Sequence, residues 1–198
     1  MAGNAMLLVC DMINDLVHAD GPGAKTYGPE IARRAILANT AAAIAKARAA
    51  GVLIGYVRVG FSADYRECPP NSRLFQGAKK NGLFKLGTWG TEVHPLLAPQ
   101  AGDFDIIKHR VSPFYCTGLD AILRANRVQR IYVAGVSSGG AVLSAAKDGH
   151  DRDYDVFVLD DCCCALSEAQ HQAVIDQVSR MTTVLRSAQV TFRETPVV

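Results

Sequence analysis

Arg130 to Ala146 read RIYVAGVSSGGAVLSAA, and this stretch decides the fold of the chain. It begins with an apolar run typical of a buried strand, passes through a glycine-rich turn and continues as the start of a helix. In an open α/β sheet this order brings the carboxyl end of a strand to a helix N-terminus, where backbone N–H groups converge on a ligand. Ala141 stands where such a turn would carry a reactive side chain, so we expect a ligand site without a nucleophile at its centre.

Strand-like and helix-like segments alternate along the rest of the chain. The predicted strands span residues 6–10, 52–59, 104–108, 130–134, 155–159 and 183–185. The predicted helices span residues 29–50, 72–80, 118–126, 141–152 and 168–181. This alternation is typical of βαβ units, so the sequence predicts a mainly parallel sheet of six strands in one α/β domain over residues 1–198.

Composition limits the classes of function. The chain has 198 residues, 49% of them hydrophobic, which is enough for one sizeable core, and a formal net charge of +2. Its Lys and Arg residues form no basic stripe with interleaved aromatics, so we expect no nucleic-acid partner. Only about five apolar residues precede Asp11, too few for a signal segment or a membrane span. We therefore expect a cytoplasmic protein that binds a small molecule and no membrane.

The cysteines and histidines do not indicate a metal site. Cys10 and residues 162–164 lie in or beside apolar strand-like runs, where cysteine acts as a small, reduced hydrophobic residue. Neighbouring side chains on an extended segment point to opposite faces, so the three adjacent cysteines cannot chelate together. The five histidines show no ligand spacing, and no glycine-rich phosphate-binding motif occurs. We predict no metal and no cofactor.

Three positions follow or end predicted strands in a way that favours a shared pocket: Asp11, Lys108 and Ala141. In open α/β sheets, ligands bind in the crevice outside the carboxyl ends of the strands. A carboxylate beside an ammonium group can exchange protons with a bound ligand. Taken singly, Asp11 could cap a turn and Lys108 could be a solvated charge, but their joint placement favours a site.

Five segments carry a resemblance to a known family: VCDMINDL (9–16), RVGFSADY (58–65), LGTWGTEVHPLL (86–97), IIKHRVSPFYCTGLDAIL (106–123) and VAGVSSGGAVLSAAKDGHDRDYDVFVLDDCCCA (133–165). In this order and spacing they resemble the isochorismatase-like hydrolase superfamily, which includes the N-carbamoylsarcosine, nicotinamide and other cysteine amidohydrolases. The resemblance covers most of the chain. It implies a three-layer, doubly wound, Rossmann-like sheet and a homo-oligomer, either dimer or tetramer.

The resemblance also implies a catalytic trio of aspartate, lysine and cysteine. Asp11 matches the aspartate and Lys108 the lysine, whereas the cysteine position falls on Ala141. A non-proline cis peptide is implied between Val136 and Ser137, with the N–H groups of Ser137 and Ala141 directed at an oxyanion. The implied substrate-binding residues are Trp89, Phe114, Tyr115, Val136, Ser137 and Gly140.

The alanine at position 141 leaves two interpretations open. A methyl group cannot attack a carbonyl, so the chain is either a cysteine amidohydrolase of the N-carbamoylsarcosine amidase type inactivated by a Cys-to-Ala exchange, or a natural member without the thiol. True isochorismatases resemble the second case, but they carry Tyr-Ala-His where this chain has residues 137–139. We favour a thiol-free hydrolase that acts through Asp11 and Lys108 on a small carboxylate-, amide- or enol-ether-type metabolite.

Two rival functions also fit features of the sequence. Residues 135–139 fit G-x-S-x-G, the nucleophile elbow of serine hydrolases, with Ser137 as the serine. Asp160 or Asp161 and then His171 follow in the order of a catalytic triad, although little chain remains to bring His171 back over Ser137. The second rival is a binding or oligomeric scaffold whose chemistry has lapsed with the missing thiol.

Overall fold

A computed structural model of the chain describes residues 4–192. Its core is one sheet of six parallel strands in the order β3-β2-β1-β4-β5-β6. The strands are β1 (Ala5–Cys10), β2 (Leu53–Val59), β3 (Phe104–Lys108), β4 (Arg130–Val136), β5 (Asp155–Cys164) and β6 (Thr183–Leu185). The chain runs from β1 to one edge and then from β4 to the other, which is the doubly wound arrangement. The predicted fold class is confirmed.

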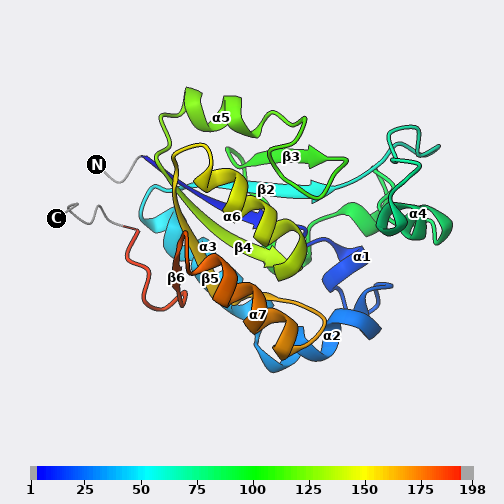
Figure 1. Ribbon diagram of the computed structural model, residues 1–198, viewed down its shortest axis with the longest axis horizontal. Helices are drawn as coiled ribbons and strands as arrows, with labels where there is room; N and C mark the ends of the chain where they lie inside the picture. The colour runs from blue at the N-terminus through cyan, green and yellow to red at the C-terminus, as the bar shows by residue number, and fades with distance from the viewer. Residues whose placement is uncertain (1–3, 193–198) are drawn as a thin grey trace.

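Helices cover both faces of this sheet (Figure 1). They are α1 (Asn14–Val17), α2 (Ala24–Arg33), α3 (Ile36–Ala49), α4 (Arg73–Lys80), α5 (Leu119–Ala125), α6 (Leu143–His150) and α7 (Glu168–Val178). Three short turns are also helical: η1 (Trp89–Thr91), η2 (Pro95–Leu97) and η3 (Ser138–Val142), the last of them a π-helical turn. Within residues 4–192, no helix is long and apolar enough to cross a bilayer.

The strands alternate their side chains between two hydrophobic cores. In β1, Leu7 and Val9 pack with α2 and α3, whereas Leu8 and Cys10 pack with α5, α6 and α7 on the opposite face. Successive side chains of a strand point to opposite faces, and both faces are covered, so every residue of β1 is buried. This explains why β1 is apolar without interruption up to Asp11.

Two predicted elements differ from the structure. The predicted helix 29–50 is broken into α2 and α3 at Ala35, whose φ is 52°. Arg34 next to the break donates to the carbonyls of Asp160 and Cys163, so tertiary hydrogen bonds outweigh the helix propensity of the alanine-rich segment. The predicted strand 155–159 continues to Cys164 after a register shift against β4, so the three adjacent cysteines belong to β5.

The long connection from β2 to β3 forms a lobe beyond the carboxyl ends of these strands. It carries α4, which stands apart from the main body in Figure 1. A third apolar cluster holds it together and includes Phe61, Phe75 and Phe84. The lobe is tied to β1 through Ile13, which belongs to the same cluster. It therefore lies over the end of the sheet where the sequence predicts the site.

Candidate active site

Asp11 lies one residue beyond β1, and three contacts fix it there. Its N–H donates to the carbonyl of Val57 at 2.7 Å, which extends the pairing with β2 by one residue. Its Oδ1 accepts a hydrogen bond from the N–H of Val59 at 2.8 Å. Its Oδ2 lies 2.9 Å from Nζ of Lys108. The φ of Asp11 is 55°, a left-handed conformation that turns the chain away from the strand.

Lys108 is the last residue of β3 and reaches Asp11 past the end of β2. Its Nζ also donates to the carbonyl of Arg110 at 3.1 Å. Only 2% of the Lys108 side chain and 8% of the Asp11 side chain are exposed. Two buried charges without a partner would be strongly destabilising, so the pair is held by mutual attraction and by its added hydrogen bonds.

The turn after β4 approaches this pair from the other side. Gly135 has a φ of 152°, and a Cβ there would lie 2.3 Å from the carbonyl oxygen of Cys10, so only glycine fits beside β1. The peptide between Val136 and Ser137 is cis. Among the described residues, the N–H of Ser137 has no hydrogen-bond acceptor. It is available to a ligand, as an oxyanion site requires.

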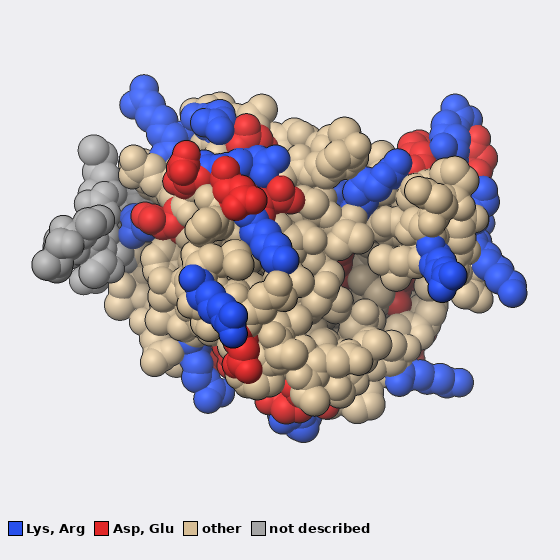
Figure 2. Space-filling model, in the orientation of Figure 1, with Lys and Arg blue, Asp and Glu red and all other residues tan. Residues whose placement is uncertain are grey.

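These elements enclose a cavity of about 100 Å³. Six of the predicted site residues line it together: Asp11, Lys108, Val136, Ser137, Gly140 and Ala141. The rest of its wall is formed by Leu16, Tyr27, Val59, Leu74, Phe75, Phe84 and Val111. Figure 2 shows the surface hollowed between the α4 lobe and the main body, at this end of the sheet.

The structure does not bring the three predicted aromatic residues to this cavity. Trp89 is 44% exposed and packs edge-on against His18, with 4.9 Å between ring centroids. Phe114 is buried in the core of α5 and α6, where the guanidinium of Arg152 lies 4.7 Å from its ring. Because Phe114 turns into the core, its neighbour Tyr115 faces outward and is 58% exposed. None of these three residues lines this cavity in the described chain, and a role for them in substrate binding stays a prediction.

Other residues form the wall in their place. Leu74 and Phe75 come from α4, and Phe84 follows it in the same lobe. Apolar residues in a Pro- and Gly-rich connection indicate that the segment buries side chains. The sequence does not show that these side chains point into the cavity. Tyr27 comes from α2, and no feature of the sequence marked it. Burial raises the pKa of the Tyr27 phenol, and a hydrogen bond with the Ser137 side chain acts in the opposite direction.

A hydrogen-bonded chain of serine, histidine and aspartate lies behind the turn. Ser138 Oγ is 2.7 Å from Nδ1 of His171, and Nε2 of His171 is 2.8 Å from Oδ1 of Asp160. Ser138 and His171 are both fully buried, and neither lines the cavity. The serine-hydrolase alternative named Ser137, whereas His171 contacts Ser138. Ser137 lines the cavity, but among the described residues no histidine is hydrogen-bonded to it, so the bonds of His171 support the turn and do not favour the serine-hydrolase alternative.

Comparison with known proteins agrees with this fold. The model of the isochorismatase domain matches residues 5–189. The chain belongs to the isochorismatase family. This family of hydrolases has the same doubly wound architecture in its solved structures. An isochorismatase family protein from Desulfovibrio vulgaris subsp. vulgaris str. Hildenborough superposes with a TM-score of 0.83 at 27% identity, covering 93% of this chain and 95% of that one.

Several relatives of this isochorismatase-family hydrolase carry the names of amide hydrolases. A ureidoacrylate amidohydrolase RutB of Methylorubrum extorquens is 30% identical over 87% of this chain and 71% of its own length. The chain spans only 58% of the length of the RutB proteins from two other strains of that organism. The N-carbamoylsarcosine amidase of Thermoplasma acidophilum has a TM-score of 0.77 at 28% identity, covering 94% of this chain and 98% of that one.

No group of three or more His, Cys, Asp or Glu side chains in residues 4–192 is arranged to hold a metal ion. All six cysteines are free, and five of them are buried. Burial raises the pKa of Cys162 and of Cys164 to about 12, so these thiols are not reactive nucleophiles. The absence of a metal in the working enzyme stays a prediction.

Proposed function

We propose that the chain hydrolyses a small amide-type metabolite with water as the nucleophile. The observation that carries the proposal is the buried Asp11–Lys108 pair, 2.9 Å apart, which faces the same cavity as Ala141. The names of the amidohydrolase relatives favour an amide over the enol-ether and carboxylate classes that the sequence left open. Asp11 acts as the general base, and Lys108 compensates its charge and holds it in position.

The proposed reaction balances without a thiol. A water molecule in the cavity gives a proton to Asp11 while its oxygen bonds to the carbonyl carbon of the substrate. The negative charge that develops on the carbonyl oxygen is met by the N–H groups of Ser137 and Ala141. The C–N bond then breaks, and the leaving nitrogen takes the proton from Asp11. The products are a carboxylic acid and an amine or ammonia.

The first experiment is a hydrolysis screen of small amides with the unchanged protein and with Asp11→Asn. General base catalysis contributes about 10²- to 10⁴-fold, so Asp11→Asn should lower kcat/KM by that factor. Asp151→Asn, an exposed carboxylate on the turn after α6, is the matched control and should keep the full rate. Equal rates for Asp11→Asn and the unchanged protein would refute the role of Asp11.

A second candidate is an amidohydrolase whose thiol is missing. The position of Ala141 favours this candidate, because Ala141 is buried and lines the cavity together with Asp11. A thiol at this position would lie next to a base, as nucleophilic catalysis requires. The discriminating variant is Ala141→Cys, with release of ammonia or amine and the mass of an acyl-enzyme as readouts. New turnover with an acyl-enzyme, from a protein inactive without the thiol, would establish this candidate in place of the first.

A further inference from the structure

The charges around the cavity are unevenly distributed. Among the described residues that line it, only Asp11 and Lys108 carry a charge, and they are paired with each other. A second buried carboxylate, Asp15, lies just behind the wall, where its Oδ2 accepts a hydrogen bond from the N–H of Phe84 at 2.7 Å. The nearest arginine along the chain, Arg110, directs its guanidinium to the carbonyls of Glu67 and His109. The described surroundings of the cavity therefore hold two carboxylates and one ammonium group, which is already paired with Asp11.

A ligand carboxylate would have no cation of its own in this cavity. It would compete with Asp11 for Lys108 and would lose its hydration among apolar side chains from the lobe, such as Leu74 and Phe75. An unpaired charge transferred into such surroundings is strongly disfavoured. A neutral amide brings no such charge, and its N–H and C=O groups need only hydrogen-bond partners.

Two hydroxyl groups supply neutral hydrogen bonding at the cavity wall. Tyr27 of α2 and Ser137 of the turn after β4 both line it, so each can direct a hydroxyl group at a bound molecule. Since burial raises the pKa of Tyr27, its phenol stays protonated at neutral pH and can both donate and accept. The cavity of about 100 Å³ is far below the roughly 300–1,000 Å³ of pockets for drug-sized ligands. It fits a molecule of few atoms.

We propose that this site selects small uncharged amides against carboxylates of the same size, with Tyr27 as a residue that contacts the ligand and sets this specificity. The proposal rests on the proposed function, because that function is the reason for testing amides as ligands. The preference for an amide over a carboxylate is measured by binding alone. It sets the chain apart from its ureidoacrylate amidohydrolase relatives, whose named substrate carries a carboxylate.

Binding of matched pairs tests the selection without requiring turnover. Isobutyramide and isobutyrate, or propionamide and propionate, are titrated into the full chain at pH 7 by calorimetry, with a thermal-shift assay as a second readout. The amide of each pair should bind at least tenfold more tightly than its carboxylate. Equal or tighter binding of the carboxylates would overturn the proposal, and so would failure of both members to bind. Selective binding of an amide that is never hydrolysed would refute the proposed function alone.

Two variants assign the selection to residues. Leu74 lines the cavity yet is 63% exposed, so Leu74→Arg adds a cation at the wall without burying it. It should narrow or invert the preference for the amide, whereas Leu166→Arg, an exposed leucine away from the cavity, should leave it unchanged. An unchanged preference in Leu74→Arg would show that charge does not set the selection.

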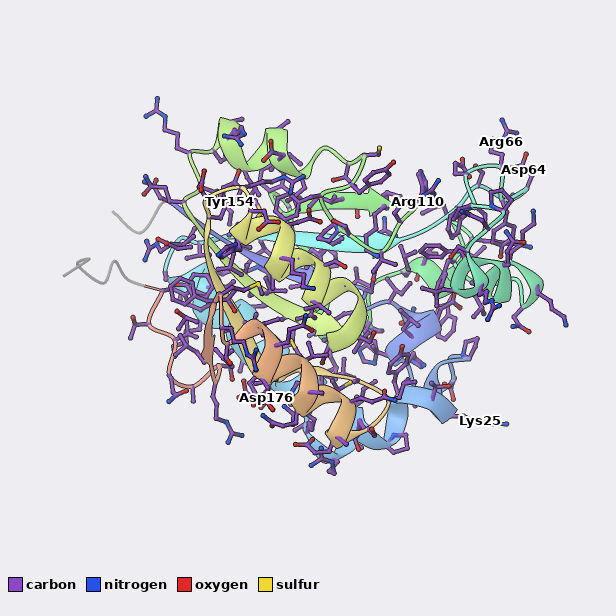
Figure 3. The ribbon with its side chains drawn as sticks, viewed as in Figure 1. Lys25, Asp64, Arg66, Arg110, Tyr154 and Asp176 are labelled. Carbon is purple, nitrogen blue, oxygen red and sulfur yellow. The ribbon has the colours of Figure 1, made fainter. Side chains whose placement is uncertain are left out.

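Tyr27→Phe removes only the phenol oxygen. Loss of one neutral hydrogen bond should weaken amide binding by about two- to tenfold and should hardly affect the carboxylate. Tyr154→Phe is the matched control, because that phenol bonds Asp120 at the opposite end of the sheet (Figure 3). Equal amide binding by Tyr27→Phe and the unchanged protein would overturn the role given to Tyr27.

Discussion

At the scale of single residues, the buried ion pair is the feature on which the site depends. Asp11 and Lys108 are contributed by strands that are separated by β2, and they meet only because both strands end at the same level of the sheet. Gly135 belongs to the same arrangement, because a larger residue there would displace β4 from β1. The sequence shows which residues stand at these positions. The register of β1, β3 and β4 in the sheet decides which of their atoms come into contact.

Breaking the ion pair should cost stability as well as activity. Lys108→Met leaves the Asp11 carboxylate buried without a cation and should lower the free energy of unfolding by about 3–5 kcal/mol. The double variant Asp11→Asn/Lys108→Met removes both charges and should recover a large part of this loss. Urea denaturation of the two single variants and the double variant measures the coupling. Losses that simply add would contradict a direct interaction.

At the scale of elements, the turn η3 is supported from behind by α7 and β5. His171 of α7 contacts Ser138 of the turn and Asp160 of β5, and Arg34 reaches the same carboxylate from the break between α2 and α3. Four segments distant in sequence are thereby joined. The oxyanion turn is held by this network, although none of its polar side chains faces the cavity.

This network predicts a pH dependence of stability. The hydrogen bond with His171 lowers the pKa of Asp160, with Arg34 acting in the same direction against the effect of burial. A carboxyl group with a lowered pKa in the folded state stabilises above its unfolded value of about 4, and this contribution is lost as pH falls through the folded pKa. Asp160→Asn should therefore show a smaller loss of unfolding free energy between about pH 5 and pH 2 than the unchanged protein. Chemical denaturation across this range measures it, and parallel curves for the two proteins would contradict the network.

At the scale of the whole molecule, the lobe around α4 closes one side of the cavity and leaves apolar groups on the outside. Among residues 4–192, the exposed large hydrophobic side chains are Leu74, Trp89 and Leu96 of the connection from β2 to β3, with Tyr115 and Leu166 elsewhere on the surface. Leu96 also borders an apolar groove of about 410 Å³ along α2 and the start of α3. Apolar surface of this kind is typical of contacts between subunits.

The homo-oligomer predicted from the sequence can be tested on this surface. Light scattering after size exclusion should give a mass of two or four times 21.2 kDa. Leu96→Glu should shift the population towards the monomer, because a carboxylate in an apolar interface is not compensated. Asn81→Glu, an exposed change at the end of α4, is the control and should leave the mass unchanged. A monomer at every protein concentration would refute the prediction.

The sequence by itself determined the sheet, the doubly wound arrangement implied by the family resemblance, and the residues at three strand ends. Local periodicity and turn chemistry are sufficient to place the six strands and to give the ends of β1 and β3, because these features depend on neighbouring residues. The break at Ala35 and the extension of β5 to Cys164 were missed because they depend on partners distant in sequence, such as Arg34 with Asp160.

Only the tertiary structure decided which side chains face the ligand. Phe114 could have lined the cavity or entered the core, and the packing of α5 and α6 placed it in the core. Tyr27 and Leu74 reach the cavity from segments whose local sequence does not mark them as ligand-binding residues. A strand end fixes where a residue lies, whereas the direction of a side chain depends on what packs around it. The composition of the pocket, and with it the discrimination between charged and neutral ligands, is therefore a property of the fold as a whole.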